Sequence, residues 1–260
     1  MRSEVSLGVS PCPNDTYIFA ALIQGLIDCR PYAIRTSLFD VQVLNETGLK
    51  GGFDVVKLSA AAFGQARDAY RLLRSGGALG RGCGPLLVAA QDLAPEDLAH
   101  RPIAVPGLLT TAFLLLSRCL KPEGAILPMR YDRIMPAVAS GEAAAGVVIH
   151  EGRFTYPRYG LCKILDLGQW WEDTTGMPIP LGVIAAKRDL GSEFAAWMED
   201  RIRASLEFAR THEDRVWPFI RAHAQELDEA TLRSHIDTFV TEFSWNMGEE
   251  GEKSLLSLLE

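Results

Sequence analysis

His150 is the residue of this sequence best suited to acid–base chemistry. It follows the apolar run 145–149 and precedes Glu151 and Arg153 in the stretch IHEGR. A histidine with an unperturbed pKa of about 6.5 gains or loses a proton near neutral pH, as general acid–base catalysis requires. We therefore predict that His150 is catalytic. Glu151 either orients it or faces solvent, and Arg153 either binds a carboxylate or holds its loop.

Three hydroxyl side chains and a lysine follow other strand-like runs. Lys57 and Ser59 occur in VVKLSAAAF, and Thr110 and Thr111 occur in VPGLLTTAFLLL. A serine or threonine before a helix is typical of an N-cap, and hydroxyls beside helix N–H groups also suit a carboxylate or hydroxyl ligand. The second stretch lacks the GxxxxGK[ST] spacing of a phosphate-binding loop. We predict that these four residues bind substrate, although Lys57 at the solvent edge and plain helix caps are the alternatives.

The stretch SPCPNDTYIFAAL, residues 10–22, predicts a stiff corner between a strand and a helix. Its two prolines fix two φ angles, and Asn14 or Asp15 can cap the helix that follows. The first N–H groups of that helix also attract an anionic ligand, so we include both residues among the substrate-binding candidates. Cys12 is a weaker candidate for a nucleophile, because no base is visible nearby to form its thiolate.

Composition and charge exclude several classes of function. The net charge is −7, and no cluster of lysine and arginine suggests a nucleic-acid partner. No apolar run has the length of a membrane span or of a signal peptide, so we expect a cytoplasmic protein that binds a small molecule. The five cysteines lack CxxC spacing, which argues against a disulfide framework and a zinc site. We expect no metal, and solvated or packing roles for the other histidines, which are His100, His212, His223 and His235.

The candidate residues require a framework of alternating strands and helices. Strand-like runs at 4–9, 33–39, 53–58, 102–105, 126–131 and 145–150 alternate with helical runs, which predicts α/β architecture with a largely parallel sheet. Ligands of such sheets bind beyond the carboxyl ends of the strands, where these side chains occur.

A further strand at 183–187 precedes mostly helical sequence that begins at 192. If this strand returns to the first sheet, the chain forms two lobes with two crossings and a ligand cleft between them. The larger lobe would contain 1–90 and 183–260, and the smaller lobe 91–182 with the crossings.

Several stretches resemble a known family when they are taken together in chain order. The combination is similar to the 1,4-dihydroxy-6-naphthoate synthases of the futalosine route to menaquinone. The stretches are SPCPNDTYIFAAL, KLS, LRSGGALGRGCGPLLVA, TTAFLLL, RYDRIMPAV, IHEGRFTYPRYGL and DLGQWWEDTTGMPIPLG, followed by AHAQEL and GEEGE.

The resemblance implies a two-lobed, periplasmic-binding-protein-like fold of type II and an enzyme without metal or redox cofactor. It implies a carbon–carbon lyase that releases the bicyclic dihydroxynaphthoate from cyclic dehypoxanthine futalosine. The histidine of the IHE motif, here His150, is then the catalytic base, and Ser59, Thr110 and Thr111 hold the ligand. The chain departs from the family pattern at Ala60, where an aromatic residue is common, and at Gly152, where a serine is common.

Two other functions remain open from the residues alone. A two-lobed fold also suits a protein that binds a small carboxylate without catalysis. A cysteine-dependent enzyme using Cys12 is the second, and its test is the activity of Cys12→Ser.

Overall fold

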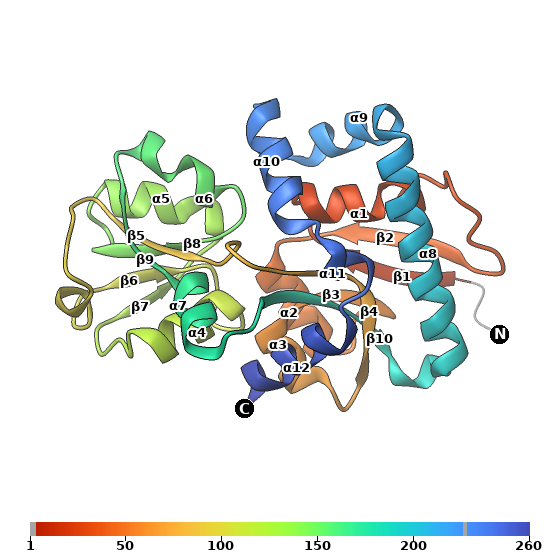
Figure 1. Ribbon diagram of the computed structural model, residues 1–260, viewed down its shortest axis with the longest axis horizontal. Helices are drawn as coiled ribbons and strands as arrows, with labels where there is room; N and C mark the ends of the chain where they lie inside the picture. Colours follow the sequence, from red (N-terminus) through yellow and green to blue (C-terminus); the bar gives the residue numbers. More distant parts are fainter. Residues whose placement is uncertain (1–3, 226–227) are drawn as a thin grey trace. The chain divides into compact units, whose positions relative to one another are not determined.

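The computed structural model describes residues 4–225 and 228–260. The last two residues of the AHAQEL stretch lie outside the described residues. The chain divides into two compact units, of which unit 1 contains the residues up to Gly80 together with Pro180–Glu260, and unit 2 contains Arg81–Ile179. Each unit contains its own five-stranded sheet (Figure 1). None of the helices among the described residues is long and apolar enough to cross a membrane.

The sheet of unit 1 is mixed rather than largely parallel. Its order is β2-β1-β3-β10-β4, in which β1 pairs in parallel with β2 and β3, whereas β10 pairs antiparallel with β3. The direction in which a distant segment joins a sheet is not encoded by local alternation, so the sequence pattern did not reveal the antiparallel pair. The strands are β1 (Glu4–Val9), β2 (Ala33–Leu38), β3 (Val55–Ser59), β4 (Tyr70–Gly80) and β10 (Ile179–Lys187).

Helices cover both faces of this sheet (Figure 1). On one face, α1 (Pro13–Ile23) and α8 (Gly191–Thr211) pack on β1 in an apolar core that includes Leu7, Phe19 and Ile202. On the other face lie α2 (Val41–Leu49) and α3 (Ala60–Ala66), against which α12 (Gly248–Leu259) packs. The remaining helices of unit 1 are α9 (Glu213–His223), α10 (Glu229–Phe239) and α11 (Glu242–Trp245). Both α9 and α10 contact α1.

Strand β4 is difficult to predict from the sequence because it contains several glycines. Residues 76–84 read as turn-rich, yet β4 runs through Gly80. Gly76 adopts a φ of +84°, and a Cβ there would lie 2.9 Å from the Ile184 side chain. The glycine therefore serves close packing inside a strand rather than a turn.

The sheet of unit 2 has the order β7-β6-β8-β5-β9. Strand β6 pairs in parallel with β7 and β8, and β5 pairs antiparallel with β8 and β9. Residues 86–89, which were predicted to belong to the larger lobe, thus contribute β5 to this second sheet. The strands are β5 (Leu86–Ala89), β6 (Ile103–Val105), β7 (Ile126–Pro128), β8 (Ala145–Val148) and β9 (Cys162–Asp166).

Four helices accompany this second sheet. Helix α5 (Tyr131–Ala139) contributes Ile134 to the core that it shares with β5, β6 and β8. In Figure 1, α5 and α6 (Gly152–Thr155) lie on one side of the sheet, and α4 (Thr111–Cys119) and α7 (Leu167–Thr175) lie on the other. Within unit 2, Gly84 approaches α7 so closely that a Cβ on Gly84 would lie 2.2 Å from Cα of Gly168.

Candidate functional site

Helix α1 begins too early in the sequence for Asn14 or Asp15 to be its N-cap residue. The helix begins at Pro13, and Cys12 occupies the N-cap position without a side-chain hydrogen bond. The capping prediction is therefore wrong, because both residues already lie in the first turn of the helix. Their side chains are buried and take part in a polar cluster of unit 1.

Asp15 is the centre of this polar cluster. Its Oδ2 accepts hydrogen bonds from Ser10 N (3.1 Å) and Ser10 Oγ (2.8 Å). Its Oδ1 accepts from Asn14 Nδ2 at 3.0 Å and from Lys57 Nζ at 2.5 Å. Four donors therefore surround one fully buried carboxylate in the first turn of α1, where the helix N-terminus is a favourable place for a negative charge.

Lys57 reaches Asp15 from β3. Side chains alternate along a strand, so Lys57 points to the same face as Val55, which packs in the core with α1 and α8. Gly182 of β10 leaves room for the lysine, since a Cβ there would lie 2.8 Å from Lys57 Cε. The Lys57 side chain is 7% exposed, which excludes the solvent-edge alternative.

The Lys57 ammonium retains hydrogen-bonding capacity. Among the described residues, Asp15 is its one hydrogen-bond partner. An ammonium carries three N–H donors, so two remain that a ligand oxygen can accept. The Lys57 ammonium can therefore donate to a further oxygen in addition to Asp15.

Ser59 occupies the N-cap position of α3 but does not cap it with its side chain. Instead, Asn45 of α2 donates from Nδ2 to Ser59 Oγ (3.0 Å), and Ser59 N donates to Asn45 Oδ1 (2.8 Å). Because Oγ accepts from Asn45, its own proton can be donated to a ligand. Asn45 was not among the predicted site residues. Its signal in the sequence is a polar residue beside Leu44 at a buried position of an amphipathic helix.

His150 lies in the turn that follows β8 in unit 2. The strand ends at Val148, two residues before the predicted end, and His150 adopts a left-handed φ of +53°. A positive φ is uncommon for a residue other than glycine and is found disproportionately at functional sites. The imidazole meets the ring of Tyr131, the first residue of α5, edge-on at 4.9 Å between ring centroids. Nε2 of His150 is buried.

Arg153 joins three segments of unit 2. Its guanidinium donates to the carbonyl oxygen of Gly84 (2.6 Å) and to Oδ2 of Asp166 (2.8 Å). Asp166 in turn accepts from Gly168 N and Gln169 N and so caps α7. These bonds favour the loop-holding alternative for Arg153. The neighbouring Glu151 is buried and begins the short helix α6.

The two threonines occupy the start of α4. Thr110 caps the helix, since its Oγ1 accepts from Phe113 N at 3.2 Å and donates to Gly107 O at 2.7 Å. Thr111 is the first helical residue, and both threonines are 3% exposed. The structure thus shows the helix cap that was the alternative to substrate binding, and Thr110 is the residue that provides it.

All five cysteines are free thiols. Burial raises the pKa of Cys83 to about 12, so this side chain remains a neutral thiol at physiological pH. Cys12 is buried at the start of α1. Within the described part of the chain, no group of three or more His, Cys, Asp or Glu residues is arranged to hold a metal ion.

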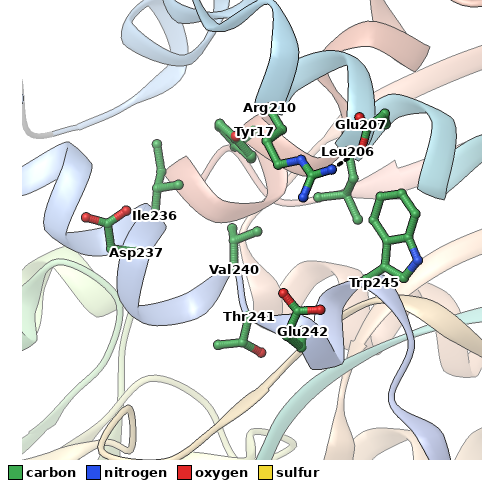
Figure 2. Close-up of a pocket in the computed structure, with 10 residues that line it drawn as sticks. All are labelled: Tyr17, Leu206, Glu207, Arg210, Ile236, Asp237, Val240, Thr241, Glu242 and Trp245. Atoms are coloured by element: carbon green, nitrogen blue, oxygen red, sulfur yellow. Dashed lines mark hydrogen bonds and ion pairs between the residues drawn. The ribbon is translucent and has the colours of Figure 1, made fainter.

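A separate pocket of about 360 Å³ lies in unit 1 between α1, α8, α10 and α11 (Figure 2). Arg210 and Glu207 form an ion pair at 2.7 Å on its wall, and Asp237 and Glu242 add two carboxylates. This surplus of negative charge disfavours an anionic ligand. None of the predicted site residues lines the pocket, which is formed by Tyr17, Leu206, Glu207, Arg210, Ile236, Asp237, Val240, Thr241, Glu242 and Trp245.

Comparison with solved structures identifies the fold. A protein of Archaeoglobus fulgidus with a crystal structure has a TM-score of 0.93 and 32% identity, covering 98% of this chain and 95% of that chain. The periplasmic aliphatic sulphonate binding protein SsuA of Escherichia coli has a TM-score of 0.67 and 13% identity, covering 92% and 80%. The predicted two-lobed, periplasmic-binding-protein-like fold of type II is confirmed.

Comparison with curated proteins agrees with the predicted resemblance. A 1,4-dihydroxy-6-naphthoate synthase of Thermus thermophilus is 49% identical over 253 residues, which cover 97% of this chain and 91% of the relative. A protein of the same name from Streptomyces coelicolor is 42% identical over 260 residues, covering 98% and 91%. The family model described as menaquinone biosynthesis matches residues 5–260. The chain therefore belongs to the menaquinone biosynthesis family.

Proposed function

We propose that this protein is a 1,4-dihydroxy-6-naphthoate synthase that cleaves cyclic dehypoxanthine futalosine as a carbon–carbon lyase. The observation that carries the proposal is the name shared by two relatives at 49% and 42% identity over nearly the whole chain. The quoted motifs around His150 and Ser59 are those on which the family resemblance rests. A cytoplasmic location, as for an enzyme of cofactor biosynthesis, is part of the same proposal.

His150 is the proposed catalytic base. Its left-handed backbone and its contact with Tyr131 support this role, because they hold the imidazole in one defined orientation. The base removes a proton from carbon, and the electron pair of that C–H bond forms a new C=C bond of the ring as the adjacent carbon–carbon bond breaks. The sugar-derived portion leaves with the electron pair of the broken bond and takes up a proton. Formation of the aromatic ring then supplies much of the driving force.

Polar groups in each unit have proposed binding roles. In unit 1, the Ser59 hydroxyl donates to a substrate oxygen, and Lys57 donates to the substrate carboxylate. In unit 2, Thr110 and Thr111 bind the substrate at the start of α4, where N–H groups favour developing negative charge on an enolate-like oxygen. Asn14 and Asp15 act by holding Lys57, and we propose that Arg153 orders the loop of His150.

The experiment compares turnover of cyclic dehypoxanthine futalosine by the wild type, His150→Asn and His150→Gln, with product detected by liquid chromatography and mass spectrometry. Asparagine tolerates a left-handed backbone, so His150→Asn removes the base with little change in the turn. We expect both variants to lose roughly 10²-fold or more in kcat while their melting temperatures stay near that of the wild type. Full turnover by a folded His150→Asn would refute the role of the base.

A carboxylate-binding protein without catalysis is the second candidate, because the fold is shared with periplasmic binding proteins such as SsuA. The same experiment separates the two functions. If a folded wild type binds 1,4-dihydroxy-6-naphthoate in calorimetry but forms no product from the precursor, the binding function is favoured and the synthase function is rejected. Product formation by the wild type excludes a purely binding role.

A further inference from the structure

His235 is a buried histidine to which the proposed mechanism gives no role. It lies in α10, is 0% exposed, and packs against Phe239 with ring centroids 4.6 Å apart. Its Nε2 lies 3.0 Å from Oδ1 of Asn14 in α1. A solvated or packing role was predicted for His235, but the complete burial of a polar ring against an amide indicates a more specific role.

The direction of each hydrogen bond in this region follows from the acceptor at its end. Asp15 is a carboxylate that accepts only, so the Asn14 group that faces Asp15 Oδ1 at 3.0 Å must be the amide NH₂. The amide oxygen of Asn14 therefore faces His235, and an oxygen accepts, so Nε2 of His235 carries the hydrogen. A flipped amide would place two acceptors against each other at Asp15.

The bonds form one continuous chain from α10 to β3. His235 donates to Asn14, Asn14 donates to Asp15, and Lys57 donates to the same oxygen of Asp15 at 2.5 Å. All four residues are buried, with exposed fractions of 6% or less. In such an interior, each bond restricts the position of the next group, because an unsatisfied polar atom is costly.

We propose that His235 is a positioning residue, which holds Asn14 and Asp15 so that the Lys57 ammonium presents its two remaining N–H groups to the carboxylate of the ligand. The inference rests on the proposed function, in which Lys57 binds that carboxylate. His235 touches neither the substrate nor the reacting atoms. Its loss therefore weakens recognition of a carboxylate more than it slows the chemical step.

The test measures the affinities of two probes by calorimetry under anaerobic conditions. The first probe is 1,4-dihydroxy-6-naphthoate, and the second is 1,4-dihydroxynaphthalene, which lacks the carboxylate. His235→Phe keeps a ring against Phe239 but removes the donor, and His235→Gln keeps an N–H donor at a similar reach. We expect His235→Phe to bind the carboxylate probe about 5- to 10-fold more weakly, with unchanged affinity for the second probe, and His235→Gln to restore most of the loss.

A second comparison asks whether the effect passes through Lys57. In a Lys57→Met background, adding His235→Phe should cause no further loss of affinity for the carboxylate probe. With the natural precursor as substrate, His235→Phe should raise KM by a similar factor and change kcat less than twofold.

Three outcomes separate the possible explanations. Equal losses of affinity for both probes would overturn the proposal and leave His235 a purely structural role. Further loss in the Lys57→Met background would overturn the route through Lys57. If the folded wild type binds neither probe, the proposed function itself fails. If His235→Phe does not fold, Asn14→Leu is tested in the same way, because it removes the next residue in the row of hydrogen bonds from His235 to Lys57. If Asn14→Leu binds both probes with the same relative affinities as the wild type, the proposal is overturned.

Discussion

Removal of the positive charge of Lys57 is expected to destabilise the protein strongly. Lys57→Met keeps an unbranched apolar chain beside Gly182 but leaves the carboxylate of Asp15 without its counter-charge. The side chains of the pair are 7% and 1% exposed, and breaking a buried pair from one side costs about 3–5 kcal/mol. Three hydrogen bonds, from Ser10 and Asn14, still stabilise the carboxylate, so we expect the lower end of about 3 kcal/mol.

The double variant Asp15→Asn with Lys57→Met removes both charges and tests the reasoning. Asp15→Asn alone leaves the Lys57 ammonium without its counter-charge and is likewise expected to cost about 3 kcal/mol. If these costs arise from an unpaired charge, the double variant loses at most about 4 kcal/mol relative to the wild type, whereas independent effects would add to about 6 kcal/mol. The expected coupling free energy is therefore at least about 2 kcal/mol.

The assay is urea unfolding followed by circular dichroism and by tryptophan fluorescence, with agreement of the two probes as the condition for a two-state analysis. Lys187→Met is the matched control, because Lys187 lies in β10 at 3.6 Å from Asp54 and its side chain is 23% exposed. We expect that control to cost less than about 1 kcal/mol. A loss below about 1 kcal/mol for Lys57→Met, or additive effects in the cycle, would refute the account of a buried, mutually dependent pair.

Three further predictions concern the rest of the chain. Gly84→Ala should destabilise unit 2 by at least about 3 kcal/mol in urea unfolding, since its Cβ would lie 2.2 Å from backbone of Gly168; a loss under 1 kcal/mol would contradict so close an approach. Lys121→Gly should raise the free energy of unfolding by about 0.5–1 kcal/mol, because Lys121 has a φ of +49° just after α4, where glycine is favoured; an unchanged or lower value would be evidence against strain there. Cys83, whose pKa burial raises to about 12, should stay a thiol at every pH below that value, so iodoacetamide at pH 9 followed by peptide mass spectrometry should label exposed Cys162 and leave Cys83 unlabelled in the folded protein.

Local sequence patterns were sufficient for most elements that position the candidate site. The predicted bounds of β1 match the structure, and the N-cap of α4 is Thr110, one of the two threonines expected at a helix start. Period-two and helical patterns follow from burial, and the Thr110 cap uses only backbone groups three residues away on either side. The family resemblance also came from the sequence, because it rests on the order of short motifs rather than on geometry.

Local sequence patterns did not predict the antiparallel pairing of β10 and β5, or the glycine-rich strand β4. Strand β10 joins the first sheet after an excursion through unit 2, and β5 joins the second sheet with a direction that nothing local specifies. In β4, Gly76 occupies a position where Ile184 leaves no space for a side chain, although such a glycine normally indicates a turn. Pairing partners and close approaches are long-range properties, so a single sequence does not display them.

The candidate site likewise combines features that the sequence predicts with contacts that only the fold determines. The sequence by itself determined which residue types are available for chemistry: the histidine after a buried strand, the lysine and serine of the KLS stretch, and the paired threonines. Only the tertiary structure decided their partners, such as Lys57 with Asp15 across 42 positions of the chain, or His235 with Asn14 across 221. The physical reason is that a buried polar group must find its hydrogen-bond partner in three dimensions, and the fold rather than the local sequence determines which group lies within reach.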